Sequence, residues 1–432
     1  MELLDLVLSE SNLNKAIAKV VKNKGSAGID GMSVEVGREY FNKHKEEIIK
    51  AIKTRTYKPQ PVKRVEIPKP DGGVRNLGIP CVIDRFIQQA INQVLSPIYE
   101  KQFCDYSYGF RPKRDCHMAI KKSLDYLNEG YTVLVDMDLE KFFDKVNHDK
   151  LMQVINNTIK DSDLLSIIRK YLVSGIMVNG VVIESEEGTP QGGNLSPLLS
   201  NIMLNELDNE LLNRGLRFVR YADDCIIFVK SMRAGQRVME SITAFIEKKL
   251  KLKVNKSKSK VDYCTNNIKF LGFGFYYCLR RKQIRIRVHP KSVKRIKDKL
   301  RNLTSRSWSV DLKYRLFKLK QVIVGWINYF RLADIKSLTE TLDRLIRRRI
   351  RACIWKAWKR ISKRFNALKR LIVLFKLRKT EEDAWALANT RKGIMHTSKS
   401  LNGFIINKAL ALKGLVSMLE YYNTSRLKLN VH

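Results

Sequence analysis

The 432-residue sequence predicts an α+β fold around one mainly antiparallel sheet, followed by a basic helical region. The expected strands and helices are mixed along the chain and do not alternate strictly, which argues against a parallel sheet. After Pro290 the pattern changes to long, basic amphipathic helices. An apolar share of 44% is ordinary for a globular protein, and the length suffices for two or three domains.

Each expected element follows from its hydrophobic period and from the turn residues at its ends. In chain order these are helices at 12–22 and 38–53, a hairpin at 62–80 around an Asp-Gly-Gly turn, helices at 82–100 and 115–128, strands at 132–138 and 177–185, a helix at 197–213, strands at 217–221 and 225–230, and helices at 233–250 and 335–361. The first two helices are joined by the glycine-rich segment 23–31, which we expect to be a mobile loop.

The charge of the chain is strongly positive and unevenly distributed. The net charge is +39, and residues 281–380 contain 32 basic against 5 acidic side chains. Such an excess suits a long polyanion, so we expect nucleic acid to bind. In the helix 335–361, Arg344, Arg348 and Arg351 form a stripe opposite the apolar positions, where they would follow phosphates.

Cysteine usage and hydropathy indicate the compartment. The seven cysteines are scattered without a Cys-x-x-Cys pair, which predicts unpaired thiols in a reducing compartment and no zinc site. No run of about 18 apolar residues predicts a membrane span, and no signal peptide is recognised. We therefore expect a cytoplasmic protein with no membrane partner.

Two acidic segments are candidates for a catalytic centre. Asp223 and Asp224 lie between apolar residues in Tyr-Ala-Asp-Asp-Cys-Ile-Ile, which predicts a hairpin with both acids at its turn. Adjacent carboxylates repel, so they are typical either of a solvated turn or of a cation site. Asp136 and Asp138 end another expected strand and share one of its faces. Three carboxylates from two strand ends would suit two Mg²⁺ ions about 3.5–4 Å apart.

Seven short motifs occur in a fixed order along the chain. They are Ile67-Pro-Lys-Pro-Asp-Gly-Gly, Tyr108-Gly-Phe-Arg-Pro, Asp138 through Phe143, Gly188-Thr-Pro-Gln-Gly-Gly-Asn-Leu-Ser-Pro, Tyr221-Ala-Asp-Asp, Asn255-Lys-Ser-Lys and Phe270-Leu-Gly-Phe. With this series the chain resembles a group II intron-encoded reverse transcriptase, or maturase. Its short length and lack of a Cys- and His-rich nuclease module make it most similar to the bacterial class C members without an endonuclease domain.

The resemblance implies a right-hand polymerase with fingers, palm and helical thumb, preceded by a helical N-terminal extension. The implied domains are the extension at 1–61, the fingers and palm at 62–288, the thumb, also called the X domain, at 289–366, and a small DNA-binding domain at 367–432. It implies an RNA-directed DNA polymerase that copies intron RNA and assists splicing and retrohoming. The implied partners are structured intron RNA, an RNA template with a DNA primer, target DNA and deoxynucleoside triphosphates.

The same resemblance assigns the site residue by residue. Asp138, Asp223 and Asp224 are the implied catalytic triad and, with Leu139, the ligands of two Mg²⁺ ions, for which Mn²⁺ is a substitute. Asp138 is preferred over Asp136 because Phe143 follows it by five positions, where an aromatic ring would exclude a ribose 2′-hydroxyl. Asp136 and Asp144 are then structural. The residues implied to bind the incoming nucleotide are Lys69, Arg75, Phe143 and Gln191. Those expected to contact nucleic acid are Asn23, Lys24, Gly25, Arg64, Arg111, Lys258, Arg344, Arg348 and Arg351.

Three alternatives stay open at the level of sequence. The first is a splicing cofactor that has lost polymerase activity. The second is an RNA-dependent RNA polymerase. The third is a retroelement or defence-associated reverse transcriptase without an intron. The intact triad, Phe143 and Gln191 disfavour the first, and Phe143 disfavours the second. The N-terminal extension and the thumb motif Gly325-Trp-Ile-Asn-Tyr-Phe-Arg331 favour the intron family over the third.

Overall fold

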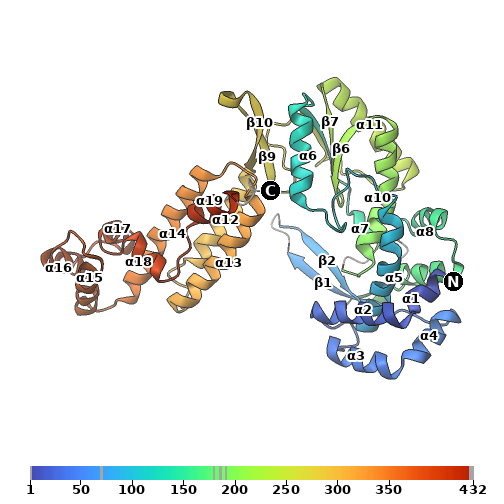
Figure 1. Ribbon diagram of the computed structural model, residues 1–432, viewed down its shortest axis with the longest axis horizontal. Helices are drawn as coiled ribbons and strands as arrows, with labels where there is room; N and C mark the ends of the chain where they lie inside the picture. Colours follow the sequence, from blue (N-terminus) through green and yellow to red (C-terminus); the bar gives the residue numbers. More distant parts are fainter. Residues whose placement is uncertain (1, 69–71, 179–180, 184–186, 190–191, 428–432) are drawn as a thin grey trace. The chain divides into compact units, whose positions relative to one another are not determined.

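A computed structural model describes residues 2–68, 72–178, 181–183, 187–189 and 192–427 (Figure 1). The chain folds as two compact units, residues 1–266 and residues 267–432. Each unit has its own buried core, so we describe the two separately. No helix in the described part of the chain has the length and apolarity that are needed to cross a bilayer.

Four short helices open the first unit. They are α1 (Leu3–Leu8), α2 (Glu10–Lys22), α3 (Val34–Lys43) and α4 (Lys45–Lys53). The predicted helix at 12–22 is therefore α2, whereas the predicted helix at 38–53 is two helices that meet at His44. The helix α2 buries Leu13, Ile17 and Val20 and packs against α5 (Val82–Glu100).

A four-stranded sheet follows, in the order β2-β1-β4-β5. The antiparallel hairpin of β1 (Val62–Pro68) and β2 (Val74–Ile79) is the one that the sequence predicts. The strand expected at 177–185 is instead a pair of short strands, β4 (Ile176–Val178) and β5 (Val181–Ile183), of which β4 runs parallel to β1.

The second sheet is wholly antiparallel, in the order β6-β7-β3-β8. Its strands are β6 (Arg217–Tyr221), β7 (Asp224–Val229), β3 (Val133–Met137) and β8 (Lys260–Tyr263). The helix α11 (Met232–Lys249) packs on β3 and β8, and α6 (Cys116–Asn128) packs on β6. The predicted α+β class with mainly antiparallel pairing is confirmed, but the described strands of this unit form two four-stranded sheets and not the one sheet that was expected.

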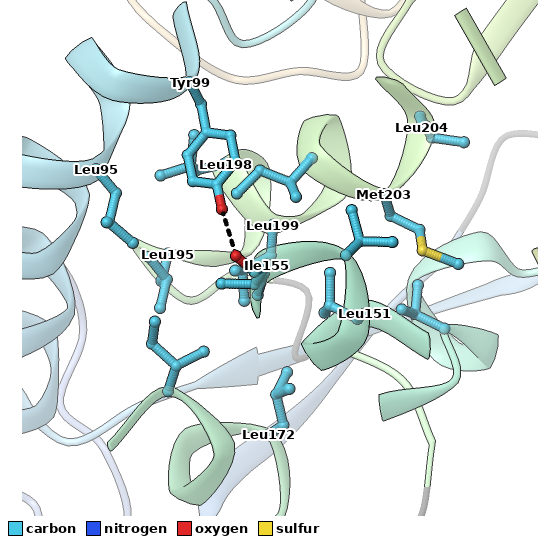
Figure 2. Packing of buried hydrophobic residues seen from close by; sticks show 14 of the residues in the cluster. Leu95, Tyr99, Leu151, Ile155, Leu172, Leu195, Leu198, Leu199, Met203 and Leu204 are labelled. Carbon is cyan, nitrogen blue, oxygen red and sulfur yellow. Dashed lines mark hydrogen bonds between the residues drawn. The ribbon is translucent and has the colours of Figure 1, made fainter. Parts of the chain in front are cut away.

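The core of the first unit centres on α10 (Ser196–Asn213), which is buried almost all round. Figure 2 shows Leu199 and Met203 of this helix among Leu151, Ile155 and Leu95. The Tyr99 hydroxyl donates to the Ile155 carbonyl at 3.3 Å, so the polar tip of this buried ring has a partner. The residues 151 and 155 belong to α8 (His148–Thr158), which with α9 (Ser162–Leu172) was not predicted from the sequence.

The second unit begins with a hairpin and continues as helices. The hairpin is β9 (Phe273–Cys278) and β10 (Gln283–Val288). The helices are α12 (Pro290–Leu303), α13 (Leu312–Phe330), α14 (Lys336–Ala357), α15 (Ile361–Phe375), α16 (Glu381–Ala388), α17 (Ile394–Ser400), α18 (Asn407–Leu412) and α19 (Met418–Leu427). The predicted helix at 335–361 is thus α14, and it ends at Ala357.

The β9–β10 hairpin is fastened to the helices that follow it. Arg285 pairs with Asp334 at 2.5 Å, and the Asp334 amide donates to the Ile286 carbonyl at 2.9 Å. The sequence-based division placed residues 267–288 with the fingers and palm, whereas these residues fold with the second unit. The four functional domains and their limits stay a prediction.

Candidate polymerase active site

Strand register brings the predicted acids to one end of the second sheet. In the β3–β7 ladder Met137 pairs with Cys225, so the next position along β3, Asp138, lies opposite Asp224. In the β6–β7 hairpin Tyr221 pairs with Asp224, which leaves Ala222 and Asp223 as the two-residue turn. The sheet therefore carries Asp138, Asp223 and Asp224 on neighbouring strand ends, as the sequence predicted.

The strand ends that carry these acids are neighbours in the sheet, but the three carboxylates do not form a metal-binding cluster. The described residues contain no group of three or more His, Cys, Asp or Glu side chains arranged to hold a metal ion. Asp224 is exposed and Asp223 is half-buried. The Lys258 ammonium lies 3.9 Å from Asp138 Oδ2. Like charges at one strand end repel unless a cation lies between them, and hard carboxylate oxygens are what Mg²⁺ prefers. The donor set thus fits Mg²⁺.

The turn that carries Asp223 has an unusual backbone. Ala222 has a φ of +57°, a left-handed conformation that few residues other than glycine adopt. A Cβ at Gly109 would lie 2.2 Å from the Ala222 nitrogen, so only glycine allows this close approach. The turn therefore rests on the backbone of the Tyr108-Gly109 segment, and this contact gives that motif a structural role.

The buried guanidinium of Arg220 binds the backbone of this turn. Arg220 Nη1 donates to the Ala222 carbonyl at 2.9 Å and to Asn201 Oδ1 at 3.0 Å. The same guanidinium binds both oxygens of Asp208, at 2.7 and 2.5 Å. Burial alone would lower the pKa of Arg220, but the Asp208 carboxylate outweighs that effect and raises it. Arg220 is therefore a charged positioning residue behind the acids.

Sequence reasoning missed this network, although it left a signal. Asn201, Asn205 and Asp208 are polar positions at helical spacing on the buried side of helix α10. All three are buried, and Asn201 Nδ2 also donates to the Gly109 carbonyl at 2.9 Å. A polar stripe inside an all-round buried helix indicates buried partners, and here those partners support the turn.

The backbone of Asp138 is fixed by a distant segment. The Asp138 amide donates to Ser259 Oγ at 3.0 Å, and the Asn255 amide donates to the Asp138 carbonyl at 2.8 Å. Leu139, 8% exposed, forms an isolated bridge with Val254. The Asn255-Lys-Ser-Lys258 motif thus positions the first acid.

Phe143 lies in the short helix α7 (Phe142–Lys145) beside a cavity of about 260 Å³. Its ring packs edge-on against Phe142 at 5.3 Å, and its carbonyl accepts from the Thr189 amide at 2.6 Å. Arg64 and Asn76 of the β1–β2 hairpin line the same cavity. A half-buried ring that contacts Phe142 and whose backbone is bound by Thr189 can act as a steric boundary. Asp144 follows Phe143 and also lines the cavity.

The other predicted nucleotide contacts are only partly described. Arg75 is exposed on β2 opposite Ile67. Lys69 and Gln191 lie outside the described residues. Arg64 is half-buried on β1 opposite Gly78. The partner of Arg75 on β1 is Ile67, three residues from Arg64, so Arg64 and Arg75 lie on opposite faces of the hairpin.

The N-terminal loop is held against the start of α5. Arg85 donates to the Pro80 carbonyl at 3.0 Å and to the Ser26 carbonyl. A Cβ at Gly28 would lie 2.7 Å from the Cys81 Cα, so the loop backbone touches the chain there. Asn23, Lys24 and Gly25 are exposed. The segment expected to be mobile thus has fixed contacts and presents its first residues to solvent.

Two predicted nucleic-acid contacts are wrong because the side chains are buried. The Arg111 guanidinium binds Glu100 at 2.7 Å and the Ser107 carbonyl at 2.9 Å, and its side chain is 2% exposed. Arg351 is 5% exposed, donates to the Ile405 carbonyl at 2.8 Å and binds Asn407 Oδ1 at 2.9 Å. Both arginines are buried and bind other segments of the protein, so neither presents its guanidinium on the surface to a phosphate.

The arginine stripe of α14 is therefore not continuous. Arg344 is exposed and donates to Thr341 Oγ1 at 3.2 Å. Arg348 is half-buried and donates to the Met395 carbonyl at 3.2 Å. The C-terminal segment covers the side of α14 that the sequence assigned to solvent, since α17 and α19 pack on this helix.

Two family models match this chain. A reverse transcriptase (RNA-dependent DNA polymerase) model matches residues 67–275, and a group II intron maturase-specific domain model matches residues 293–372. Protein YkfC of Escherichia coli is 32% identical over 310 residues, which are 62% of this chain and 81% of that protein. Group II intron-encoded protein LtrA of Lactococcus lactis is 31% identical over 323 residues, covering 60% of this chain and 54% of LtrA.

A putative COX1/OXI3 intron 2 protein of Saccharomyces cerevisiae is 28% identical over 62% of this chain and 37% of the yeast protein. Among solved structures, a partial Cas6-RT-Cas1–Cas2 complex matches 57% of this chain and 43% of its own at 23% identity and a TM-score of 0.38. This chain thus spans about half of LtrA and four-fifths of YkfC.

The fold and the acid-bearing hairpin define a reverse transcriptase, an RNA-directed DNA polymerase, and proteins with this domain generally use divalent metal ions. A maturase-specific domain follows it in the same chain. The chain belongs to the family of group II intron-encoded reverse transcriptases, or maturases.

Proposed function

We propose that this protein copies intron RNA into DNA and binds that RNA to assist splicing and retrohoming. The observation that carries the polymerase part is the strand register that sets Asp138 opposite Asp224, with Asp223 at the adjoining turn. The basic excess of residues 281–380 carries the RNA-binding part. We also propose a cytoplasmic location and target DNA as a further partner.

Asp138, Asp223 and Asp224, with the Leu139 carbonyl, are the proposed ligands of two Mg²⁺ ions, for which Mn²⁺ could substitute. When bound, such ions lower the pKa of a primer 3′-hydroxyl and neutralise the charge on the triphosphate. The protein's own task is then positioning. Arg220 holds the turn that carries Asp223, and Ser259 holds the backbone of Asp138.

The incoming deoxynucleotide would meet Arg75 and Lys69 through its phosphates and Phe143 through its sugar. A guanidinium binds phosphate oxygens in pairs, and an ammonium acts as a point charge. The edge contact with Phe142 and the Thr189 bond support a fixed Phe143 ring, which a steric boundary at C2′ requires. Gln191 is proposed to lie beside the nucleotide.

The proposed nucleic-acid surface consists of Asn23, Lys24 and Gly25 of the N-terminal loop together with Arg64, Lys258, Arg344 and Arg348. The exposure of the loop residues and of Arg344 supports this assignment. Arg111 and Arg351 are no longer part of the proposed surface, because their side chains are buried inside the protein.

The decisive experiment is primer extension on an RNA template with Mg²⁺, using Asp223→Ala. We expect the variant to lose nearly all extension and to retain RNA affinity, because the half-buried carboxylate lies at a turn and is not part of the hydrophobic core. Asp144→Ala is the matched control, an acid near Phe143 that is outside the proposed triad. Normal extension by Asp223→Ala, or equal losses in both variants, would contradict the assignment. If the wild-type protein showed no primer extension but still assisted splicing, the splicing-cofactor alternative would be favoured.

A further inference from the structure

Two adjoining cavities in the second unit are lined by cations, hydroxyls and two tryptophans. They lie at the segment Thr304–Ser309 that joins α12 to α13, and both are lined by Arg306 and Lys356. We propose that together they bind one unpaired nucleotide extruded from folded RNA, the base in the first cavity and the sugar-phosphate in the second. This inference rests on the proposed function, in which the protein binds intron RNA.

The first cavity has the lining that a nucleobase requires. Its volume is about 330 Å³, and Trp308 and Trp358 are both in its wall and both only half-buried. Unpaired bases in RNA are recognised mainly by stacking on aromatic side chains. Lys359 and Lys413 are exposed at its rim, where they can meet the phosphates on either side of the base.

The second cavity has the lining that a ribose-phosphate requires. Its volume is about 560 Å³, and Ser305 and Ser307 contribute hydroxyls beside Arg349, whereas the buried Thr304 hydroxyl donates to the Leu300 carbonyl at 2.6 Å. Hydroxyls can donate to and accept from a ribose 2′-hydroxyl, which distinguishes RNA from DNA. Among the described residues that line either cavity there is no Asp or Glu. The whole site is therefore electropositive, as an anionic ligand requires.

The loop between the cavities is rigidly held, which favours binding. Arg315 donates to the carbonyls of Leu303 at 2.6 Å and Trp308 at 2.6 Å, and its guanidinium lies 5.0 Å from the Trp308 ring. Arg349 Nε donates to Thr304 Oγ1 at 2.7 Å, and Lys356 Nζ donates to the Arg306 carbonyl at 2.9 Å. A preorganised loop loses little conformational entropy when a ligand binds.

Three features favour RNA with an extruded base over other polyanions. The maturase-specific match spans residues 293–372 and so covers both tryptophans and the loop. A paired base inside a duplex has no exposed face to stack on Trp308. A phosphate-only ligand, such as an acidic lipid surface, would leave the tryptophan-lined cavity without an occupant. The geometry therefore selects a nucleotide whose base is free.

The test compares two RNA duplexes that differ in one unpaired uridine, bound to the full-length protein. Trp308→Leu and Trp358→Leu should each weaken binding of the bulged duplex by about 5- to 150-fold, the range for losing one stacked base. Binding of the fully paired duplex should change less than about twofold, because the phosphate contacts remain. Trp385→Leu, a change at a tryptophan 54% exposed on α16, is the matched control and should leave both affinities unchanged.

A second measurement on the unaltered protein covers the case in which a variant does not fold. A 4-thiouridine at the bulge should crosslink to the peptides that contain Trp308 or Trp358, and a 4-thiouridine at a paired position should not. Crosslinks elsewhere, or equal losses for both duplexes in the variants, would overturn the proposal. Equal affinity for a bulged DNA duplex would overturn the assignment to RNA. Primer extension on the same preparations reports separately on the polymerase function.

Discussion

Arg220 offers the sharpest test of how this fold supports its acids. Its guanidinium is buried, bound to Asp208 through two hydrogen bonds and bound to the Ala222 carbonyl at the catalytic turn. Arg220→Met removes both functions at once. The double variant Arg220→Met with Asp208→Leu removes the charged pair as a whole and leaves no unpaired buried charge. Comparing the two separates the stability of the fold from the positioning of Asp223.

The expected magnitudes follow from the burial of both partners, whose side chains are 1% and 0% exposed. Removing one partner of a buried ion pair costs about 3–5 kcal/mol, because the other charge stays uncompensated. Replacing both partners with apolar residues is often close to neutral. The double variant should therefore recover most of the free energy of unfolding. It should not recover extension, since the Ala222 carbonyl has still lost its donor and a displacement of about 1 Å can reduce a rate about 100-fold.

The assays are denaturant unfolding of the full chain and single-nucleotide extension on a preformed RNA–DNA duplex. The control is the exposed pair Arg169–Asp149, for which Arg169→Met should cost less than about 1 kcal/mol and leave extension unchanged. A double variant with wild-type extension would refute the positioning role of Arg220. A double variant as unstable as Arg220→Met would refute the electrostatic account of the pair.

Three further predictions concern sugar choice, pH and the arginine stripe. Phe143→Ala should shift the preference for deoxynucleotides towards ribonucleotides by about 1–3 kcal/mol, measured as the ratio of their kcat/KM values, and an unchanged ratio would make Phe143 a packing residue only. Burial raises the pKa of Asp84 from 3.8 to about 6, so the folded state favours the neutral acid and stability falls as pH rises from about 4 to about 6. Relative to Asp84→Asn, the wild-type free energy of unfolding should fall by about 3 kcal/mol between pH 4 and pH 7, measured by hydrogen exchange around α5, and a flat difference would contradict the buried charge. Arg344→Gln should lower the slope of log RNA affinity against log salt by up to about 0.9 without changing stability. Arg351→Gln should instead lower the free energy of unfolding by about 1–3 kcal/mol, because the Ile405 carbonyl loses its donor. The reverse pattern would restore Arg351 to the RNA surface.

Local sequence patterns predicted the elements that have strong periods and clear turns. The helix at 82–100 and the strand at 217–221 have the limits that the sequence indicated, because their apolar residues repeat with the period of a helix or a strand. The Asp-Asp hairpin could also be predicted, since apolar residues flank the acidic pair on both sides. Helices α8 and α9 were missed, although both are amphipathic and capped by side chains of Asn147 and Asp161.

What the sequence could not supply was the partner of each charged group. Arg111 and Arg351 look like solvent-facing cations in a strongly basic chain, but Glu100 and Asn407 meet them only in the folded structure. Arg220 adjoins the catalytic motif, yet its role depends on Asp208, twelve residues earlier on α10. A local sequence pattern indicates whether a segment is a helix or a strand. Whether a long cationic side chain is buried depends on residues that are distant in the sequence and that contact it only in the folded protein.

The hydrogen bond between the Asp138 amide and Ser259 joins residues 121 positions apart. Strand β8, which completes the sheet beside β3, lies equally far along the chain. At a synthesis rate of about 5–20 residues per second, about 6–24 s pass on the ribosome between the two residues. Both edges of β3 are unpaired until β7 has been made, and the edge facing β8 stays unpaired until the end of that interval. Unpaired edges invite association with other chains. The polymerase centre is thus completed late in synthesis, so slow translation of residues 139–259 should lower the yield of active protein more than slow translation after residue 266.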